Sequence, residues 1–141
     1  MARRGATVIA ITDLIEVCDE QYARHLGWFE LLGQRVRAEP DPKLQRLFAT
    51  AAQRHAWHAE LWASRRPAIP HDTIHTLPPA AAPSISGNLA TAYLEHLVDE
   101  RAELARLRAS VDRDLDPATV RVIDLVAADL ADLQSQVPPT T

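Results

Sequence analysis

Apolar residues recur at spacings of three and four positions through most of the chain, a pattern typical of helices packed in a bundle. Proline-containing segments interrupt this pattern. Glu39-Pro40-Asp41-Pro42 and Asp114-Leu115-Asp116-Pro117 each place an Asp before a Pro, which favours a helix start. Residues 7–11 are β-prone, so an alternative is that the first helix begins only at residue 12, with Thr12 as its cap. The pattern predicts helices over residues 8–38, 42–65, 86–113 and 117–136.

A proline-rich strap, residues 66–85, separates the second and third predicted helices, and Ser84 or Ser86 could cap the third. The strap is too long for a tight turn, whereas the other two connections are short. Short connections make neighbouring helices antiparallel, and a long crossover can join two such hairpins. The sequence therefore predicts one all-α domain over residues 1–141, an antiparallel four-helix bundle, with an up-down-up-down bundle as the alternative.

The residues at these spacings form one seam on each helix, and the seam is expected to face the core. The first helix offers Ile11, Ile15, Cys18, Tyr22, His25, Phe29, Leu32 and Val36. The second offers Leu44, Phe48, Ala51, His55, His58 and Trp62, and the third offers Ala90, Tyr93, Leu97, Glu100, Leu104, Leu107 and Val111. The fourth offers Ile123, Val126, Leu130 and Leu133. The first three seams thus carry titratable groups near their midpoints, and the fourth carries none.

The titratable seam residues are predicted to meet in one layer. If the two ends of the first hairpin face each other, His25 faces His55. Tyr22 faces His58 in the same register, and Glu100 lies near the middle of the third helix at about the same height. A slip of three or four residues would pair these side chains differently.

Imidazole and carboxylate groups are the expected ligands of iron, manganese and zinc. His55 and His58 are three residues apart, so they lie on one helix face and can share one ion. His25 and Glu100 would complete a four-ligand set, with Tyr22 beside it as a hydrogen-bond donor or redox-active neighbour. Alternatively, these groups hydrogen-bond to one another and satisfy a partly polar core.

Composition excludes several classes of function. The chain is 47% hydrophobic and 24% charged, as in ordinary globular proteins, and its net charge of -4 gives no reason to expect nucleic acid. No stretch reads as a signal peptide or membrane span, and the sequence has no glycine-rich phosphate loop or Cys-x-x-Cys pair. A single cysteine, Cys18, suits a reducing compartment, so the predicted location is cytoplasmic.

Four residues outside the seams receive separate interpretations. His96 lies off the third seam and is expected to be a solvated surface histidine. Trp28, Leu31 and Trp57 also lie off the seams and could form an apolar patch, which favours a homodimer. Burial of these residues by a differently rolled helix is an equally simple interpretation.

The stretch from Leu47 to Trp62, LFATAAQRHAWHAELW, resembles the second helix of the ferritin-like superfamily. In that family this helix often carries Glu-x-x-His, which supplies ligands for a di-iron or di-manganese centre. His58 matches the histidine of this motif, and His55 stands where its glutamate would be. Glu100 matches the carboxylate of the third helix. The resemblance covers most of the chain in architecture and implies a ferritin-like bundle.

The chain also departs from the family pattern. The first helix has Tyr22 or His25 where a glutamate is expected, unless Glu20 takes this role. The fourth helix reads VIDLVAAD over residues 122–129 and has no second Glu-x-x-His. The resemblance therefore implies either a single metal ion in an altered half-site or a scaffold that has lost its metal.

Three hypotheses follow, and the first is preferred. The protein is a metalloprotein that binds one iron or manganese ion and uses oxygen or peroxide. Alternatively, it is a non-catalytic bundle that serves as a dimerisation or protein-binding module. The third hypothesis is a metal-free enzyme that holds a small hydrophobic ligand in the bundle interior, with His55 or His58 as general base.

Overall fold

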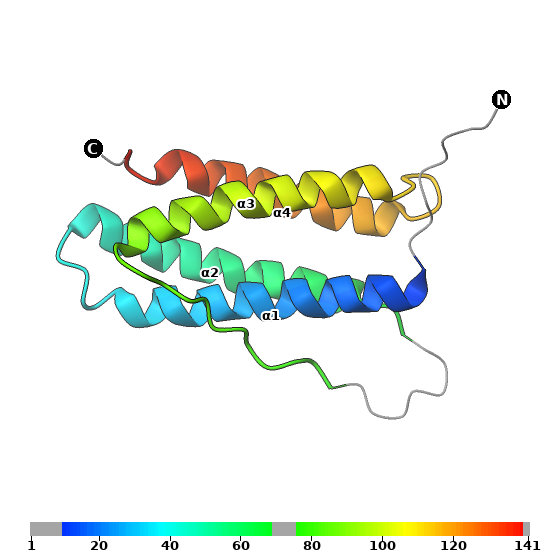
Figure 1. Ribbon diagram of the computed structural model, residues 1–141, viewed down its shortest axis with the longest axis horizontal. Coiled ribbons are helices and arrows are strands. Elements are labelled where there is room, and N and C mark those ends of the chain that lie inside the picture. The colour runs from blue at the N-terminus through cyan, green and yellow to red at the C-terminus, as the bar shows by residue number, and fades with distance from the viewer. Residues whose placement is uncertain (1–9, 69–75, 140–141) are drawn as a thin grey trace.

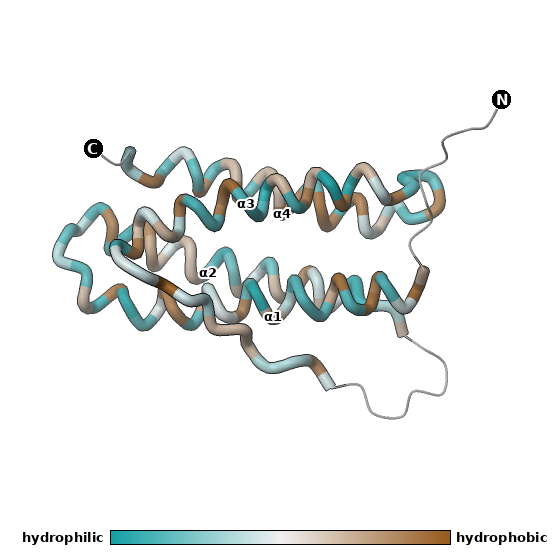
Figure 2. The backbone as a smooth tube through the Cα atoms, in the orientation of Figure 1, coloured by the Kyte–Doolittle hydropathy of each residue, from teal (hydrophilic) through white to brown (hydrophobic). Residues whose placement is uncertain are grey.

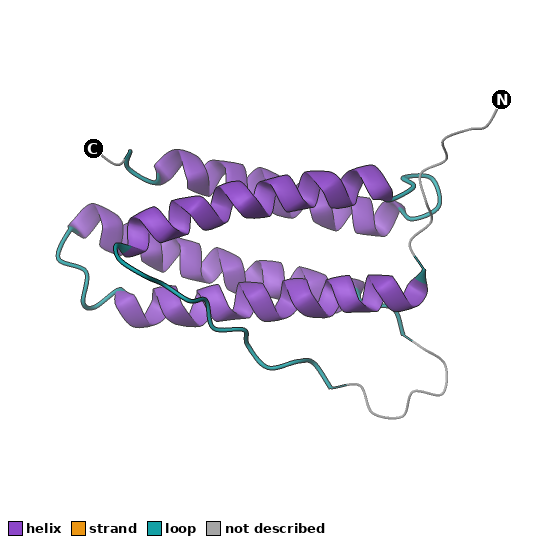
Figure 3. Cartoon of the chain, in the orientation of Figure 1, coloured by secondary structure: helices purple, strands orange, loops and turns teal. Residues whose placement is uncertain are grey.

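The structure is a computed structural model that describes residues 10–68 and 76–139. In these ranges the chain forms four helices and no strand (Figures 1 and 3). The helices are α1 (Ile11–Arg35), α2 (Pro42–Arg65), α3 (Leu89–Ser110) and α4 (Pro117–Gln136). The all-α prediction is confirmed, and the predicted bounds of α2 and α4 are correct. The predicted first helix, 8–38, extends past the observed end of α1, and the predicted third helix, 86–113, extends past both ends of α3. Residues 8 and 9 lie outside the described residues.

Side-chain caps explain where three of the helices begin. Asp41 and Asp116 each accept a backbone N–H from the first turn of the helix that follows, and a proline occupies the first helical position. Asn88 caps α3 in the same way, so Ser84 and Ser86 do not. α1 begins without a side-chain cap, and the alternative cap at residue 12 is therefore wrong.

The helices form two pairs connected by the strap. The chain runs along α1 and returns along α2, and α3 and α4 form the second pair (Figure 1). α1 packs on α2, α3 packs on α4, and the pairs meet mainly where α2 packs on α4. Apolar positions recur along each helix between polar ones (Figure 2). Among the described helices, none combines the length and apolar character needed to cross a bilayer.

The buried face of α1 differs from the predicted seam. Phe29 and Ile11, both predicted to face the core, are 37% and 63% exposed. The buried positions at alternating spacings of three and four are Leu14, Cys18, Gln21, His25, Trp28 and Leu32. The helix is rolled because Trp28, 4% exposed, packs its ring on Tyr93 of α3. Trp28 therefore belongs to the core, whereas Trp57 is 42% exposed.

The seams predicted for α2, α3 and α4 are largely correct. Their central positions are buried: Phe48, Ala51, His55, His58 and Trp62 on α2, Tyr93, Leu97, Glu100 and Leu104 on α3, and Ile123, Val126, Leu130 and Leu133 on α4. Apolar seam residues nearer the helix ends, such as Leu44 and Leu107, are half-buried. The core is thus apolar along most of its length and polar in one layer, where the titratable residues lie.

The strap docks on α1 at a glycine. The backbone N–H of Ala81 donates to the carbonyl of Ala23 at 2.9 Å, so the strap is held against the α1 backbone. A Cβ added at Gly27 would lie 1.8 Å from the Ala81 carbonyl oxygen. A methyl group cannot fit at this distance, so this close approach of the two backbones requires glycine.

We expect Gly27→Ala to displace the strap and to lower the free energy of unfolding by about 1–3 kcal/mol, the usual cost of overpacking. Urea denaturation measures this change. Gly33→Ala is the matched control, because a Cβ at Gly33 meets no atom within 4 Å. The control is expected to be neutral or stabilising by up to about 1 kcal/mol, from helix propensity. Equal stability of the two variants would show that the strap does not dock at Gly27.

Candidate metal centre

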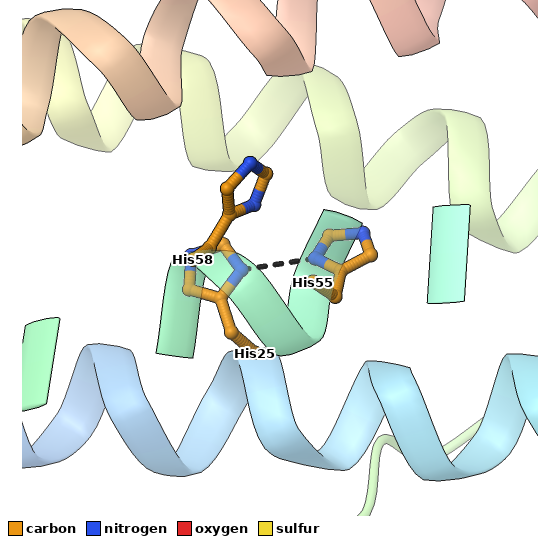
Figure 4. Close-up of side chains that lie close together, drawn as sticks. All are labelled: His25, His55 and His58. Atoms are coloured by element: carbon orange, nitrogen blue, oxygen red, sulfur yellow. Dashed lines mark hydrogen bonds between the residues drawn. The ribbon is translucent and has the colours of Figure 1, made fainter. Parts of the chain in front are cut away.

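Three histidines from two helices meet in the polar layer. His25 comes from α1, and His55 and His58 come from one face of α2. All three are fully buried, and one ring nitrogen of each lies within 4.8 Å of the others. The Nδ1 atoms of His25 and His55 are 2.9 Å apart, and Figure 4 shows these two rings facing each other, with the His58 ring beside them and directed toward the second helix pair. The histidines form a buried cluster that can hold a metal ion, and the predicted meeting of His25 with His55 is confirmed.

The outer nitrogens of the two α2 histidines contact the second helix pair. His55 Nε2 is 2.8 Å from the hydroxyl of Tyr93 on α3, and His58 Nε2 is 2.5 Å from the carboxylate of Asp129 on α4. His58 Nδ1 is buried and has no hydrogen-bond partner. The outer nitrogens are therefore used in contacts with α3 and α4, which leaves the Nδ1 atoms for the centre of the cluster.

Asp129 is suited to orient His58. Burial raises the pKa of its carboxyl, but hydrogen bonds from His58 and Arg54 outweigh this effect, and the pKa lies below its ordinary value. The ionised carboxylate can only accept, so His58 donates from Nε2, and in the neutral tautomer with this hydrogen the lone pair lies on Nδ1. A histidine that binds a metal usually donates its other ring N–H to such a partner.

Glu100 lies on the other side of His25. Its Oε1 atom is 3.7 Å from His25 Nε2, which is too long for a hydrogen bond, and both atoms are buried without a partner. Its Oε2 atom accepts from Arg24 at 2.6 Å, and Arg24 also contacts Glu103 at 2.7 Å. Burial raises the pKa of Glu100 despite the nearby guanidinium of Arg24. Nδ1 and Nε2 lie on opposite sides of the ring, so in this arrangement Glu100 and His25 Nδ1 do not face the same point.

Two histidines of the cluster, His25 and His55, are held in the neutral form. Burial lowers the pKa of His25 and His55 well below the ordinary value, and the neighbouring histidines lower both further. A neutral imidazole has one lone pair free to bind a metal, whereas a protonated one has none. The buried layer thus keeps two of its ring nitrogens available at neutral pH.

Three sequence-based assignments around the cluster differ from the structure. Tyr22 is half-buried, and the tyrosine that contacts the cluster is Tyr93, which lies 2.8 Å from His55. The predicted seam of the fourth helix has no polar member, yet Asp129 of this helix contacts His58. His96 is not a solvated surface residue, because its ring stacks on Trp28 at 4.5 Å between centroids.

The missed residues gave only weak signals in the sequence. Asp129 lies directly beside the seam position Leu130, and its contact with His58 depends on the packing of α2 on α4. Tyr93 lies on the predicted third seam, but the seam pattern does not distinguish it from the apolar core residues. His96 lies off that seam, and the rolled α1 covers it with Trp28. An Asp beside an otherwise apolar seam is the signal that could have identified Asp129.

Comparisons with protein-family models, with curated proteins and with solved structures gave no match.

Proposed function

We propose that the protein binds one transition-metal ion through the Nδ1 atoms of His25, His55 and His58. The convergence of three buried ring nitrogens within 4.8 Å carries this proposal. A buried polar atom without a partner costs about 1–3 kcal/mol, and His58 Nδ1 is such an atom. A bound ion would offset this cost, because the lone pair would then have a partner.

The separation of the nitrogens supports this set of ligands. Metal–nitrogen bonds of about 2.0–2.1 Å place the ligand atoms of a tetrahedral site about 3.4 Å apart. His25 and His55 are already at 2.9 Å, and all three ligand atoms lie within 4.8 Å of one another, so the cluster is close to the size that a metal site needs. Without a metal, one of the two Nδ1 atoms must donate its hydrogen to the other. A bound metal would require that hydrogen to lie on Nε2 instead, and for His55 the Tyr93 hydroxyl, 2.8 Å away, could accept it.

Iron is the ion that fits best among the two proposed from the sequence. Imidazole ligands suit iron, zinc, copper and nickel, whereas manganese prefers carboxylate and water oxygen. Three protein ligands would leave coordination positions open, and an iron ion held in this way would supply chemistry with oxygen or peroxide. A ferritin-like scaffold belongs to the same proposal, supported by the four helices and the long crossover between α2 and α3.

Metal titration tests the proposal. The protein is purified without a histidine tag and incubated anaerobically with Fe(II), and separately with Mn(II), Zn(II) or Co(II). Metal content after desalting is measured by mass spectrometry. We expect one ion per chain, with Fe(II) retained more strongly than Mn(II). Content near zero with all four ions would refute the metalloprotein proposal and leave a polar core that satisfies itself.

Asp129→Asn is expected to weaken metal binding by about 10–100-fold, the usual effect of losing a residue that orients a ligand. The amide removes the negative charge that fixes the hydrogen of His58 on Nε2. Competition titration of Co(II) against a chelator measures the affinity. Asp132→Asn is the matched control, because exposed Asp132 also contacts Arg54, at 3.0 Å, but does not contact His58. Equal affinities of the two variants would contradict the role of Asp129.

The binding-module hypothesis is favoured by a smaller observation. Trp57 of α2 is 42% exposed, and tryptophan is among the residues that most often anchor a protein partner. Trp28 no longer contributes, since it is buried. The homodimer and the cytoplasmic location stay predictions from the sequence.

A further inference from the structure

A pocket of about 470 Å³ lies between α1, the strap and α3. Its walls include Ala23, Arg24 and Trp28 of α1 and the strap residues 81–83, with His96 of α3 on the remaining side. We refer to it as the strap pocket. Its volume falls within the range of about 300–1,000 Å³ that is usual for small-molecule sites. The alanines and the proline make most of the wall apolar, and their small side chains leave the space open.

One polar side chain of the pocket wall is His96. His96 Nε2 is buried and forms no hydrogen bond with the residues that the structure describes. Its ring is fixed by stacking on Trp28, with 28° between the planes. Burial, followed by the charge of Arg24, lowers the pKa of His96 to about 3, so the imidazole is uncharged at neutral pH. A neutral ring nitrogen in an apolar wall is suited to one directional hydrogen bond with a ligand.

The charges around the pocket do not favour an ion. Glu20 and Arg24 both line it, and their formal charges cancel. Arg24 is also engaged by Glu100 at 2.6 Å and by Glu103 at 2.7 Å, so its guanidinium is not free for an anionic ligand. An uncharged ligand would therefore lose least on leaving water.

A larger pocket elsewhere lacks these features. It has a volume of about 650 Å³ and lies along α4 near Pro117, Arg121 and Leu125. None of the buried, unpartnered polar atoms of the described residues lines it. The strap pocket also lies near the polar layer, because the rings of His96 and His55 are 6.1 Å apart.

We propose that the strap pocket binds a small, uncharged, apolar molecule that carries one hydroxyl group, which hydrogen-bonds to the imidazole of His96. A hydroxyl both donates and accepts, so it pairs with either neutral tautomer of the ring. The apolar body of the ligand lies against Trp28 and the strap. Binding at this site does not depend on a metal ion, and it is tested on metal-free protein.

Phenol and anisole are the probes. They share an aromatic ring, but only phenol has a hydroxyl. Binding to the metal-free protein is followed by NMR, through the indole N–H of Trp28 and the ring signals of His96. We expect phenol to shift both residues in a saturable way and anisole to bind more weakly. Shifts confined to other parts of the protein, or no saturable shift, would overturn the proposal.

Two variants separate the hydrogen bond from the space. His96→Phe keeps an aromatic ring against Trp28 but removes the nitrogen, so phenol should bind about tenfold more weakly while anisole is unchanged, as for the loss of one hydrogen bond. Ala23→Leu keeps His96 and fills the pocket, so both probes should lose binding. Circular dichroism checks that each variant is folded. Undiminished phenol binding in His96→Phe would overturn the proposal, even if Ala23→Leu fails to fold.

Discussion

Replacing His55 and His58 together by glutamine is expected to abolish metal binding. A structural site with four ligands binds its ion with about 10–16 kcal/mol, or roughly 3–4 kcal/mol per ligand, so losing two ligands should weaken binding by roughly 10⁴-fold or more. Both side chains are fully buried and both belong to α2, so the change removes one complete side of the cluster. Chelator competition with Co(II) and metal analysis after desalting measure the effect.

His96→Gln is the control for this double variant. It also replaces a histidine near the polar layer, but His96 is half-buried, its ring is 6.1 Å from that of His55, and it is not one of the three that converge. Its metal affinity should equal that of the parent protein. Undiminished stoichiometry in the double variant would show that any ion binds elsewhere.

Glu100→Gln distinguishes the ligand set predicted from the sequence from the one that the geometry favours. If Glu100 only faces His25 Nε2, as its 3.7 Å separation indicates, the affinity should fall by no more than about 10–100-fold. A loss as large as that of a histidine ligand would restore the carboxylate to the set of ligands.

The sequence predicted best the features that depend on local interactions. The starts of α2 and α4 were correct, because an Asp cap and a following proline act within one turn. The buried face of α2 was also correct, because its apolar spacing leaves one choice. The meeting of His25 with His55 followed from these two features and a short hairpin connection.

The features that depend on distant residues were predicted poorly. On α1 the apolar spacing favours a core face that contains Tyr22 and Phe29. A face that contains Gln21 and Trp28 fits the helical spacing about equally well, so the sequence pattern alone does not decide between them. The choice was decided by α3, where Tyr93 packs on Trp28. The contact of Asp129 with His58 similarly requires α4 to pack on α2. A single residue on one helix is therefore only a weak signal for such contacts.

The metal-free protein is expected to lose stability as the pH falls below about 6.5. In the folded state the pKa values of His25, His55 and His96 lie below the ordinary value of 6.5, because all three are buried. In the unfolded chain these histidines titrate near that value. The unfolded state therefore binds more protons below pH 6.5, and acid favours unfolding. Each histidine can contribute up to about 1.4 kcal/mol per pH unit, so the three together can contribute up to about 4 kcal/mol per unit.

Glu100 acts in the opposite direction. Burial raises its pKa above the ordinary value of 4.5, so the folded state takes up its proton first and gains stability as the pH falls toward 4.5. One carboxyl can offset about one histidine, which leaves a net loss of up to about 3 kcal/mol per pH unit.

Urea denaturation between pH 7.5 and 5 measures this slope of stability against pH. His96→Phe should reduce it by about 1.4 kcal/mol per unit, because one of the three groups is removed. A stability that does not change across this range would mean that the histidines take up protons in the folded state, and the buried cluster would then not have the neutral lone pairs that metal binding needs.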